Sequence, residues 1–269
     1  MMLEAEAEQG LQVRIAGEED ALRWDAFVDE CKEATFFHRY GWREAVTRGL
    51  GHRCRFLLAE RGGRIEGILP LAHVRSRLFG YALVSLPGCV YGGCAARTEQ
   101  ARAALTREAC RLARELRVAA LEMRNLERTE SAWPVKDLYV TFGKPIEADH
   151  DANLKAIPRK QRAMVRKGIK AGLIGRVSDS LDDFFPIYAE SVRNLGTPVF
   201  PRRYFRALLD VFPNESEISV IRHEGQDIAA VMSFYFRDEV LPYYGGSRPQ
   251  AREVKGNDFM YWDLMCRAA

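Results

Sequence analysis

Residues 224–247, EGQDIAAVMSFYFRDEVLPYYGGS, decide the fold of this chain. The stretch opens with a turn at Glu224-Gly225-Gln226, continues through an apolar run from Ile228 to Phe236, and ends at Tyr244-Gly245-Gly246-Ser247. Short apolar runs that are separated by turn residues predict neighbouring antiparallel strands. Together with the preceding run at 218–223, the stretch therefore predicts a meander of three strands.

The same order of features occurs earlier in the chain. The aromatic segment Phe200-Pro201-Arg202-Arg203-Tyr204 precedes the meander, and its earlier counterpart is Phe36-Phe37-His38-Arg39-Tyr40. In the first copy a turn at Gly62-Gly63 follows, and the strands arrive at Tyr91-Gly92-Gly93-Cys94. The interval from aromatic segment to turn is 23 residues in the first copy and 21 in the second, whereas the interval from turn to Tyr-Gly-Gly is 28 and 19.

Similarity at a spacing above one hundred residues indicates duplicated domains, because the units of a solenoid are much shorter. A length of 269 residues is sufficient for two domains that each bury a core. We therefore predict one domain at residues 1–148 and a second at 149–269, with Tyr91 and Tyr244 at equivalent positions. Chance recurrence of the tripeptide is the alternative.

Periodicity and turn signals predict a mixed α/β fold in both domains. For the first domain we expect helices at 18–31, 40–50 and 99–116, and strands at 13–15, 53–60, 64–74, 81–86, 118–123 and 135–142. For the second we expect helices at 159–170, 181–194, 202–211 and from 257, and strands at 173–177, 218–223, 227–236 and 240–244. The second domain then lacks the last strands of the first, which predicts truncation at its C-terminus. A sheet edge left open in this way favours a dimer.

The net charge of +3 is unevenly distributed along the chain. Six basic residues and no acid lie between Arg159 and Lys170, so the rest of the chain carries −3. On a helix, Arg159, Arg162, Arg166 and Lys170 form one stripe. This face either is simply solvated or binds an anion such as a phosphate, a carboxylate or RNA. We expect Arg162, Arg166 and Lys170 to contact an anionic substrate.

Several classes of protein do not fit the sequence. The six cysteines form no Cys-x-x-Cys pair, which favours reduced thiols, and the five histidines lack the spacing of metal ligands. Neither a Gly-x-Ser-x-Gly motif nor a phosphate-binding Gly-Lys-Ser/Thr motif occurs. No apolar run is long enough to span a membrane, and the acidic N-terminus differs from a signal peptide. The sequence therefore predicts a soluble, cytoplasmic protein with no metal centre.

Several segments together resemble a known family: Phe36 to Trp42, Ile68-Leu69-Pro70-Leu71, Ser85-Leu86-Pro87, Tyr91-Gly92-Gly93, Arg162 to Gly172, Tyr243 to Ser247, and Asn257 to Trp262. The order of elements resembles the GCN5-related N-acetyltransferase (GNAT) fold. The tandem arrangement with a basic helix between the copies is similar to the FemAB peptidyltransferases. Within that family the sequence is most similar to FemAB-like proteins associated with bacterial exopolysaccharide and PEP-CTERM sorting systems.

The resemblance implies acyl or aminoacyl transfer to an amine of a cell-envelope or polysaccharide precursor. It implies no permanently bound cofactor, and the donor would be acyl-CoA or aminoacyl-tRNA. Acetyl-CoA enzymes of this fold carry Arg/Gln-x-x-Gly-x-Gly/Ala, whereas the corresponding segment here, Gln250 to Asp258, has different spacing. Two alternatives stay open: a CoA-dependent N-acyltransferase, and a noncatalytic module that binds an anionic carbohydrate or a lipid-linked precursor.

Direct acyl transfer requires an aligned amine, a proton acceptor and a group that stabilises the oxyanion. The candidate catalytic residues are Tyr244, Ser247 and Asn257, each of which also has a structural interpretation in sheet packing, a turn and a helix cap. Residues expected to contact the donor are Arg252, Lys255 and Gly256, which precede the last helix. In the first domain we expect Arg39, Trp42 and Tyr91 to mark the cleft that binds the acceptor, although Trp42 also suits a core position.

Overall fold

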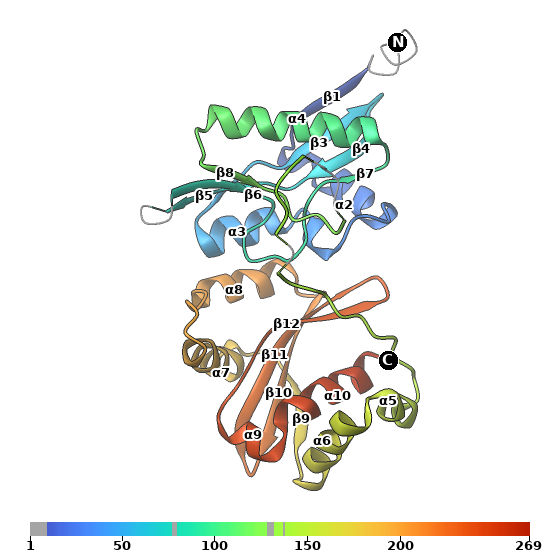
Figure 1. The fold of residues 1–269 in the computed structure, drawn as a ribbon, viewed down its shortest axis with the longest axis vertical. Helices are drawn as coiled ribbons and strands as arrows, with labels where there is room; N and C mark the ends of the chain where they lie inside the picture. The colour runs from blue at the N-terminus through green and yellow to red at the C-terminus, as the bar shows by residue number, and fades with distance from the viewer. Residues whose placement is uncertain (1–9, 77–79, 128–131, 137) are drawn as a thin grey trace. The chain divides into compact units, whose positions relative to one another are not determined.

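The computed structural model describes residues 10–76, 80–127, 132–136 and 138–269 (Figure 1). These residues divide into two compact units at residue 136. We refer to residues 10–136 as unit 1 and to residues 138–269 as unit 2. All six cysteines are free thiols.

Unit 1 contains two small sheets and the helices that cover them (Figure 1). Its strands are β1 (Leu11–Ile15), β2 (Arg53–Cys54), β3 (Leu57–Arg61), β4 (Arg64–Leu69), β5 (Ala72–Ser76), β6 (Gly80–Val84), β7 (Ala95–Ala96) and β8 (Ala120–Glu122). Its helices are η1 (Glu18–Asp20), α2 (Ala21–Glu30), η2 (Phe36–His38), α3 (Trp42–Leu50) and α4 (Glu99–Glu115). The strand orders are β1-β3-β4-β7 and β2-β5-β6-β8.

Apolar periodicity along α4 explains how unit 1 builds its core. Leu105, Ala109 and Leu112 recur at helical spacing and are buried against the sheet that contains β3 and β4. Gly67 of β4 permits this close packing, since a Cβ atom there would lie 2.9 Å from the Leu105 Cδ1 atom. The helix starts at the Thr98 hydroxyl, which accepts a hydrogen bond from the Ala101 N–H.

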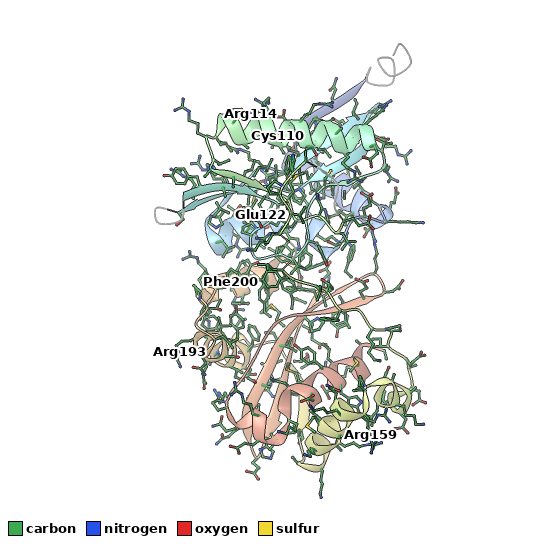
Figure 2. The ribbon with its side chains drawn as sticks, in the orientation of Figure 1. Cys110, Arg114, Glu122, Arg159, Arg193 and Phe200 are labelled. Atoms are coloured by element: carbon green, nitrogen blue, oxygen red, sulfur yellow. The ribbon has the colours of Figure 1, made fainter. Side chains whose placement is uncertain are left out.

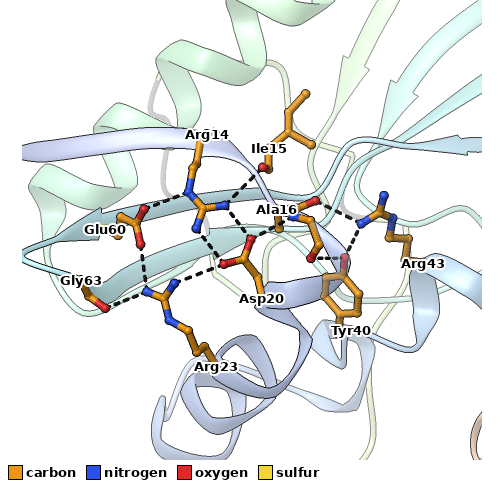
Figure 3. Close-up of polar contacts among 10 residues, drawn as sticks. Arg14, Ile15, Ala16, Asp20, Arg23, Tyr40, Arg43, Glu60 and Gly63 are labelled. Carbon is orange, nitrogen blue, oxygen red and sulfur yellow. Dashed lines mark hydrogen bonds and ion pairs between the residues drawn. The ribbon is translucent and has the colours of Figure 1, made fainter.

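A polar network ties the first elements of unit 1 together (Figure 3). The buried Asp20 carboxylate accepts two hydrogen bonds from the Arg14 guanidinium, at 2.6 and 2.7 Å. Arg14 and Arg23 both contact Glu60 of β3, and Arg23 also donates to the Gly63 carbonyl in the following turn. Hydrogen bonds from Arg14 lower the pKa values of both Asp20 and Glu60. The network therefore holds β1, η1, α2 and β3 to one another.

Unit 2 is a four-stranded antiparallel sheet with helices on both faces (Figure 1). Its helices are α5 (His150–Ala156), α6 (Arg159–Lys170), α7 (Leu181–Asn194), α8 (Arg202–Val211), α9 (Gln250–Val254) and α10 (Gly256–Ala268). Its strands are β9 (Ile174–Ser178), β10 (Ser216–His223), β11 (Gln226–Phe236) and β12 (Glu239–Ser247). The order across the sheet is β12-β11-β10-β9, so β12 is an edge strand among the described residues.

Alternation along β11 separates the two cores of unit 2. Ala229 and Val231 pack with Phe259 and Met260 of α10 on one face. Phe234 lies in an aromatic cluster with Tyr244 on the opposite face, which α7 covers. Helix α6 packs closely against α10 at Gly168. Glycine permits this approach, since a Cβ atom there would lie only 2.9 Å from the Phe259 Cβ atom.

The strand orders support a duplicated design. The order β1-β3-β4-β7 in unit 1 matches β9-β10-β11-β12 in unit 2, and two helices follow the first strand in both. However, Tyr244 lies within β12, whereas Tyr91 lies in the loop between β6 and β7. The prediction that Tyr91 and Tyr244 occupy equivalent positions is therefore wrong, because Tyr91 precedes the strand β7 that corresponds to β12. The chain leaves the sheet after β6 and returns at β7, and this excursion accounts for the longer interval in the first copy.

Other differences from the predicted elements have local causes. The strand predicted at 135–142 is wrong, since no strand occurs in residues 132–136 or 138–149, and Tyr139 and Phe142 are exposed. Alternation suggested a strand there, but no strand of the described residues pairs with it. The strand predicted at 64–74 is interrupted at Pro70, which has no N–H group to donate to a neighbour. Helices α5 and α9 were not predicted, because both are too short for a clear apolar period.

Candidate functional site

A cleft opens in unit 1 where two parallel strands end. The pair β6–β8 is parallel, while all other strand pairs of the described residues are antiparallel. Ligands commonly bind beyond the carboxyl ends of parallel strands. The cleft has a volume of about 450 Å³ and is lined by Lys32, Glu33, Thr35, His38, Tyr91, Gly92, Gly93, Cys94, Glu99, Arg102 and residues 124–127.

Hydrogen bonds fix the wall of this cleft. The Asn125 side-chain oxygen accepts from the Cys94 N–H at 3.0 Å, and a Cβ atom at Gly93 would lie only 1.9 Å from that oxygen. The buried His38 ring accepts from the Thr35 N–H at Nδ1, so its Nε2 atom donates to the Gly93 carbonyl at 3.0 Å. The neutral His38 ring therefore has a positioning role in this wall.

Arg102 and Glu33, which line the cleft, are paired with each other within unit 1. Arg102 donates to both carboxylate oxygens of Glu33, at 2.8 and 2.9 Å, and Glu33 also accepts from the Ala96 N–H at 3.0 Å. Glu33 thus places a carboxylate beside the start of α4, where helices favour negative charge. Burial raises the pKa of Cys94 to about 12, so its thiol is protonated at neutral pH and does not act as a nucleophile.

The three residues expected in this cleft have different positions. Tyr91 lies in its lining. Arg39 is paired with Asp29 at 2.7 Å, outside the lining. Trp42 is fully buried, and its indole N–H donates to the Phe36 carbonyl, which makes it a core residue. The sequence did not predict His38 or Asn125 as site residues. His38 lies in the aromatic segment, but the spacing of the histidines indicates only that they do not form a metal site.

Tyr244 is held in an aromatic box of unit 2. Its hydroxyl lies 3.1 Å from the hydroxyl of buried Tyr204, and its ring packs edge-on against Tyr188 and Phe205. Ser247 is three residues further along β12, so its side chain leaves the opposite face of the sheet. Asn257 is exposed on the first turn of α10. The structure therefore does not gather the three candidate catalytic residues around Tyr244.

The three residues expected to contact the donor lie together at the junction of α9 and α10. Lys255 adopts a left-handed conformation (φ 62°) that turns the chain between the helices, and its ammonium donates to the Arg252 carbonyl at 2.9 Å. Gly256 is buried, and a Cβ atom there would lie 2.9 Å from the Ala251 Cβ atom. The first N–H groups of α10 have no partner within the helix, as at any helix start.

The basic segment forms helix α6, with the predicted bounds (Figure 2). A shallow hollow of about 430 Å³ lies along it, lined by Arg159, Arg162, Ala163, Arg166, Lys167 and Lys170. Arg162 donates to the Lys155 and Ile157 carbonyls at the end of α5, so part of its hydrogen-bonding capacity is used internally. Arg166 and Lys170 are exposed.

Comparisons with known proteins agree with this architecture. Residues 154–269 match the family described as acetyltransferase (GNAT) domain. The structure of FemX is similar with a TM-score of 0.64 and 14% identity, over 96% of this chain and 85% of that chain. The C-terminal domain of a putative lysylphosphatidylglycerol synthetase from Agrobacterium fabrum has a TM-score of 0.50 and 12% identity, over 93% and 75% of the chains. None of the curated proteins is significantly similar in sequence.

Every helix in the part of the chain that the structure describes is too short or too polar to cross a membrane. The likeness to FemX covers both units and, at 14% identity, concerns the fold. Residues 154–269 therefore match the GNAT acetyltransferase domain family, and the chain has a fold similar to that of FemX.

Proposed function

We propose that this protein transfers an acyl or aminoacyl group from an activated donor, bound by unit 2, to an amine. The observation that carries this proposal is a difference between two corresponding junctions. In unit 1 the junction from β7 to α4 holds its own carboxylate, Glu33. In unit 2 the junction after β12 presents Arg252 and Lys255, which have no acidic partner among the described residues. Unit 2 is thus the unit suited to a phosphate-bearing donor.

The edge of β12 offers further groups to such a donor. This strand pairs only with β11 among the described residues, so backbone N–H and C=O groups of its other edge have no strand partner. The pairing of β11 with β12 shifts its register between Met232 and Ser233, which marks a bulge in this part of the sheet. Free backbone N–H groups beside a donor carbonyl stabilise the oxyanion that develops when an amine attacks.

The reaction itself needs no covalent enzyme intermediate. The amine nitrogen forms a bond to the acyl carbon, the bond from that carbon to the sulfur or oxygen of the leaving group breaks, and the amine proton passes to a base or to the leaving group. Ser247 and Asn257 remain our candidates for hydrogen bonding to the reacting groups, since both are accessible near the end of β12 and the start of α10. Tyr244 contributes by holding β12 against α7 and α8.

Aminoacyl-tRNA is the donor that we favour, with acyl-CoA as the alternative. The Agrobacterium fabrum relative is named for making lysylphosphatidylglycerol, an aminoacylated lipid. The segment Gln250 to Asp258 also departs from the usual CoA-binding spacing. For the acceptor we propose an amine of a cell-envelope or polysaccharide precursor, bound in the unit 1 cleft that Tyr91 lines.

Ligand binding by matched variants tests the proposal. The double variant R252Q/K255Q should weaken donor binding about tenfold, because each lost cation removes a contact of roughly 0.5–1 kcal/mol. Y91A should leave donor binding unchanged and weaken binding of the amine acceptor. Thermal shift with charged tRNA, acetyl-CoA and a nucleotide-activated sugar precursor provides the measurement. Stabilisation by the precursor alone, without turnover of either donor, would instead indicate a noncatalytic binding module.

A further inference from the structure

Helix α6 presents a cationic surface that the proposed reaction does not use. We define the α6 surface as Arg159, Lys160, Arg166, Lys167 and Lys170, all exposed. None of these five has an acidic partner within 4.0 Å among the residues that the structure describes. The helix is about 18 Å long, so five cations lie within three turns of one another. This density of uncompensated charge favours an extended anionic partner.

The orientation of α6 directs this surface away from the fold. Val165 and Gly168 are buried against α10, and they define the inner side of the helix. The hollow around Ala163 lies on the opposite side, where five basic side chains surround a small residue. Because Arg162 is engaged by the end of α5, it fixes α6 in this orientation. The surface is therefore presented by a rigid helix that is anchored at both its inner face and its start.

Apolar residues at the rim of the surface distinguish between two anionic partners. Ile169 lies one turn beyond Arg166 on the same side of the helix and is 43% exposed. Ile174, just past the turn at Gly172, is 63% exposed. Residues 151–178 contain no Phe, Trp or Tyr, so this region lacks the aromatic platform on which single-stranded nucleic acids stack. Cations with exposed aliphatic side chains beside them match the headgroup and acyl layers of a bilayer.

We propose that the α6 surface docks the protein on the surface of an anionic lipid bilayer. Arg and Lys side chains would contact lipid phosphates while Ile169 enters the boundary between headgroups and acyl chains. The hollow around Ala163 would accommodate one phosphate headgroup. This inference is independent of the proposed transfer reaction, because its test measures binding without turnover.

Co-sedimentation of the whole chain with vesicles tests this surface. We expect binding to vesicles of equal parts phosphatidylglycerol and phosphatidylcholine, and none to phosphatidylcholine alone. The variant R159Q/R166Q/K170Q should bind roughly 100-fold more weakly, given the usual contribution of each basic residue near a charged membrane. Arg162 is kept in this variant so that α6 stays attached to α5. The charge-matched variant R64Q/K144Q/R206Q, which removes three exposed cations elsewhere, should bind like the unaltered protein.

A second pair of variants tests the apolar rim. I169S should weaken binding to the anionic vesicles about fivefold, while I15S, which alters an isoleucine that is 44% exposed in unit 1, should have no effect. If R159Q/R166Q/K170Q and R64Q/K144Q/R206Q lost vesicle binding equally, the net charge of the protein would explain the binding. That result would overturn the proposal. Failure to bind the anionic vesicles, together with binding to total tRNA, would also overturn the proposal, because that outcome assigns the α6 surface to nucleic acid.

Discussion

Close contact with α7 explains the second glycine of the Tyr-Gly-Gly segment, Gly246. A Cβ atom at Gly246 would lie 2.8 Å from the Ser191 Cβ atom and 3.0 Å from the Tyr188 Cα atom, both on α7. The neighbouring Gly245 faces the other side of the sheet, where the nearest atom to its Cβ would be 3.5 Å away. The sequence showed that glycine occurs at both positions, but it did not show which one meets a helix.

We therefore expect G246A and G245A to differ in stability. G246A should lower the free energy of unfolding by about 1–3 kcal/mol, because the atoms that it meets belong to the backbone and to Cβ and cannot rotate away. G245A should change it by less than about 0.5 kcal/mol. Urea unfolding of both variants provides the measurement. Equal free energies of unfolding for G246A and G245A would mean that α7 can shift on β12 without cost.

The candidate site was only partly predictable at the level of single residues. Tyr244 and Ser247 were grouped because both carry hydroxyls near the end of a strand. Their separation by three positions in β12 places them on opposite faces, which the sequence implied once the strand was known. By contrast, His38 and Asn125 meet through the Gly92–Cys94 loop, and no pattern within either segment indicates that contact.

At the scale of elements, the strongest local signals gave the most accurate predictions. Helices α6, α7 and α8 have the predicted bounds, since each combines a clear apolar period with a residue suited to its start. The strand predicted at 135–142 was based only on alternating apolar and polar residues. A strand is stable only when it pairs with another strand, and the alternation did not identify one. Elements near the start of unit 1 are held instead by the ion pairs around buried Asp20 in Figure 3, which sequence patterns do not reveal.

The ion pairs around Asp20 predict a dependence of stability on pH. Asp20 has a lowered pKa in the folded protein, chiefly through its hydrogen bonds to Arg14. Its stabilising contribution is therefore complete above the unfolded value of about 3.9, and it is lost as the pH falls through the folded value. D20N should cost about 1–3 kcal/mol at pH 7, and its difference from the unaltered protein should shrink below about pH 4.

Urea unfolding at several pH values checks this expectation, with E44Q as the control. Glu44 pairs with Arg48 at 2.7 Å on the exposed face of α3, so its loss should change stability by no more than about 0.5 kcal/mol. A D20N variant as stable as E44Q at pH 7 would show that the network in Figure 3 does not stabilise the fold.

At the scale of the whole molecule, the repeated order of aromatic segment, turn and strands predicted two mixed α/β units, and the shared strand order supports that inference. What the repeat did not predict is that the units differ in charge at corresponding places. Unit 1 closes the start of α4 with Glu33, whereas unit 2 leaves Arg252 and Lys255 without acidic partners among the described residues. The two units thus share a strand order while different side chains occupy the corresponding junctions.

Separate cores predict that unit 2 folds without unit 1. The fragment 138–269 has the aromatic box around Tyr244 on one side of its sheet and the cluster around Phe259 on the other, and a length of about 130 residues suits an independent domain. It contains one tryptophan, Trp262, which packs against Phe259, so its fluorescence reports this core alone. We expect a single cooperative urea transition for the fragment, and donor binding that R252Q/K255Q still weakens. A gradual fluorescence change without a transition, alongside cooperative unfolding of the whole chain, would mean that the two units form one folding unit.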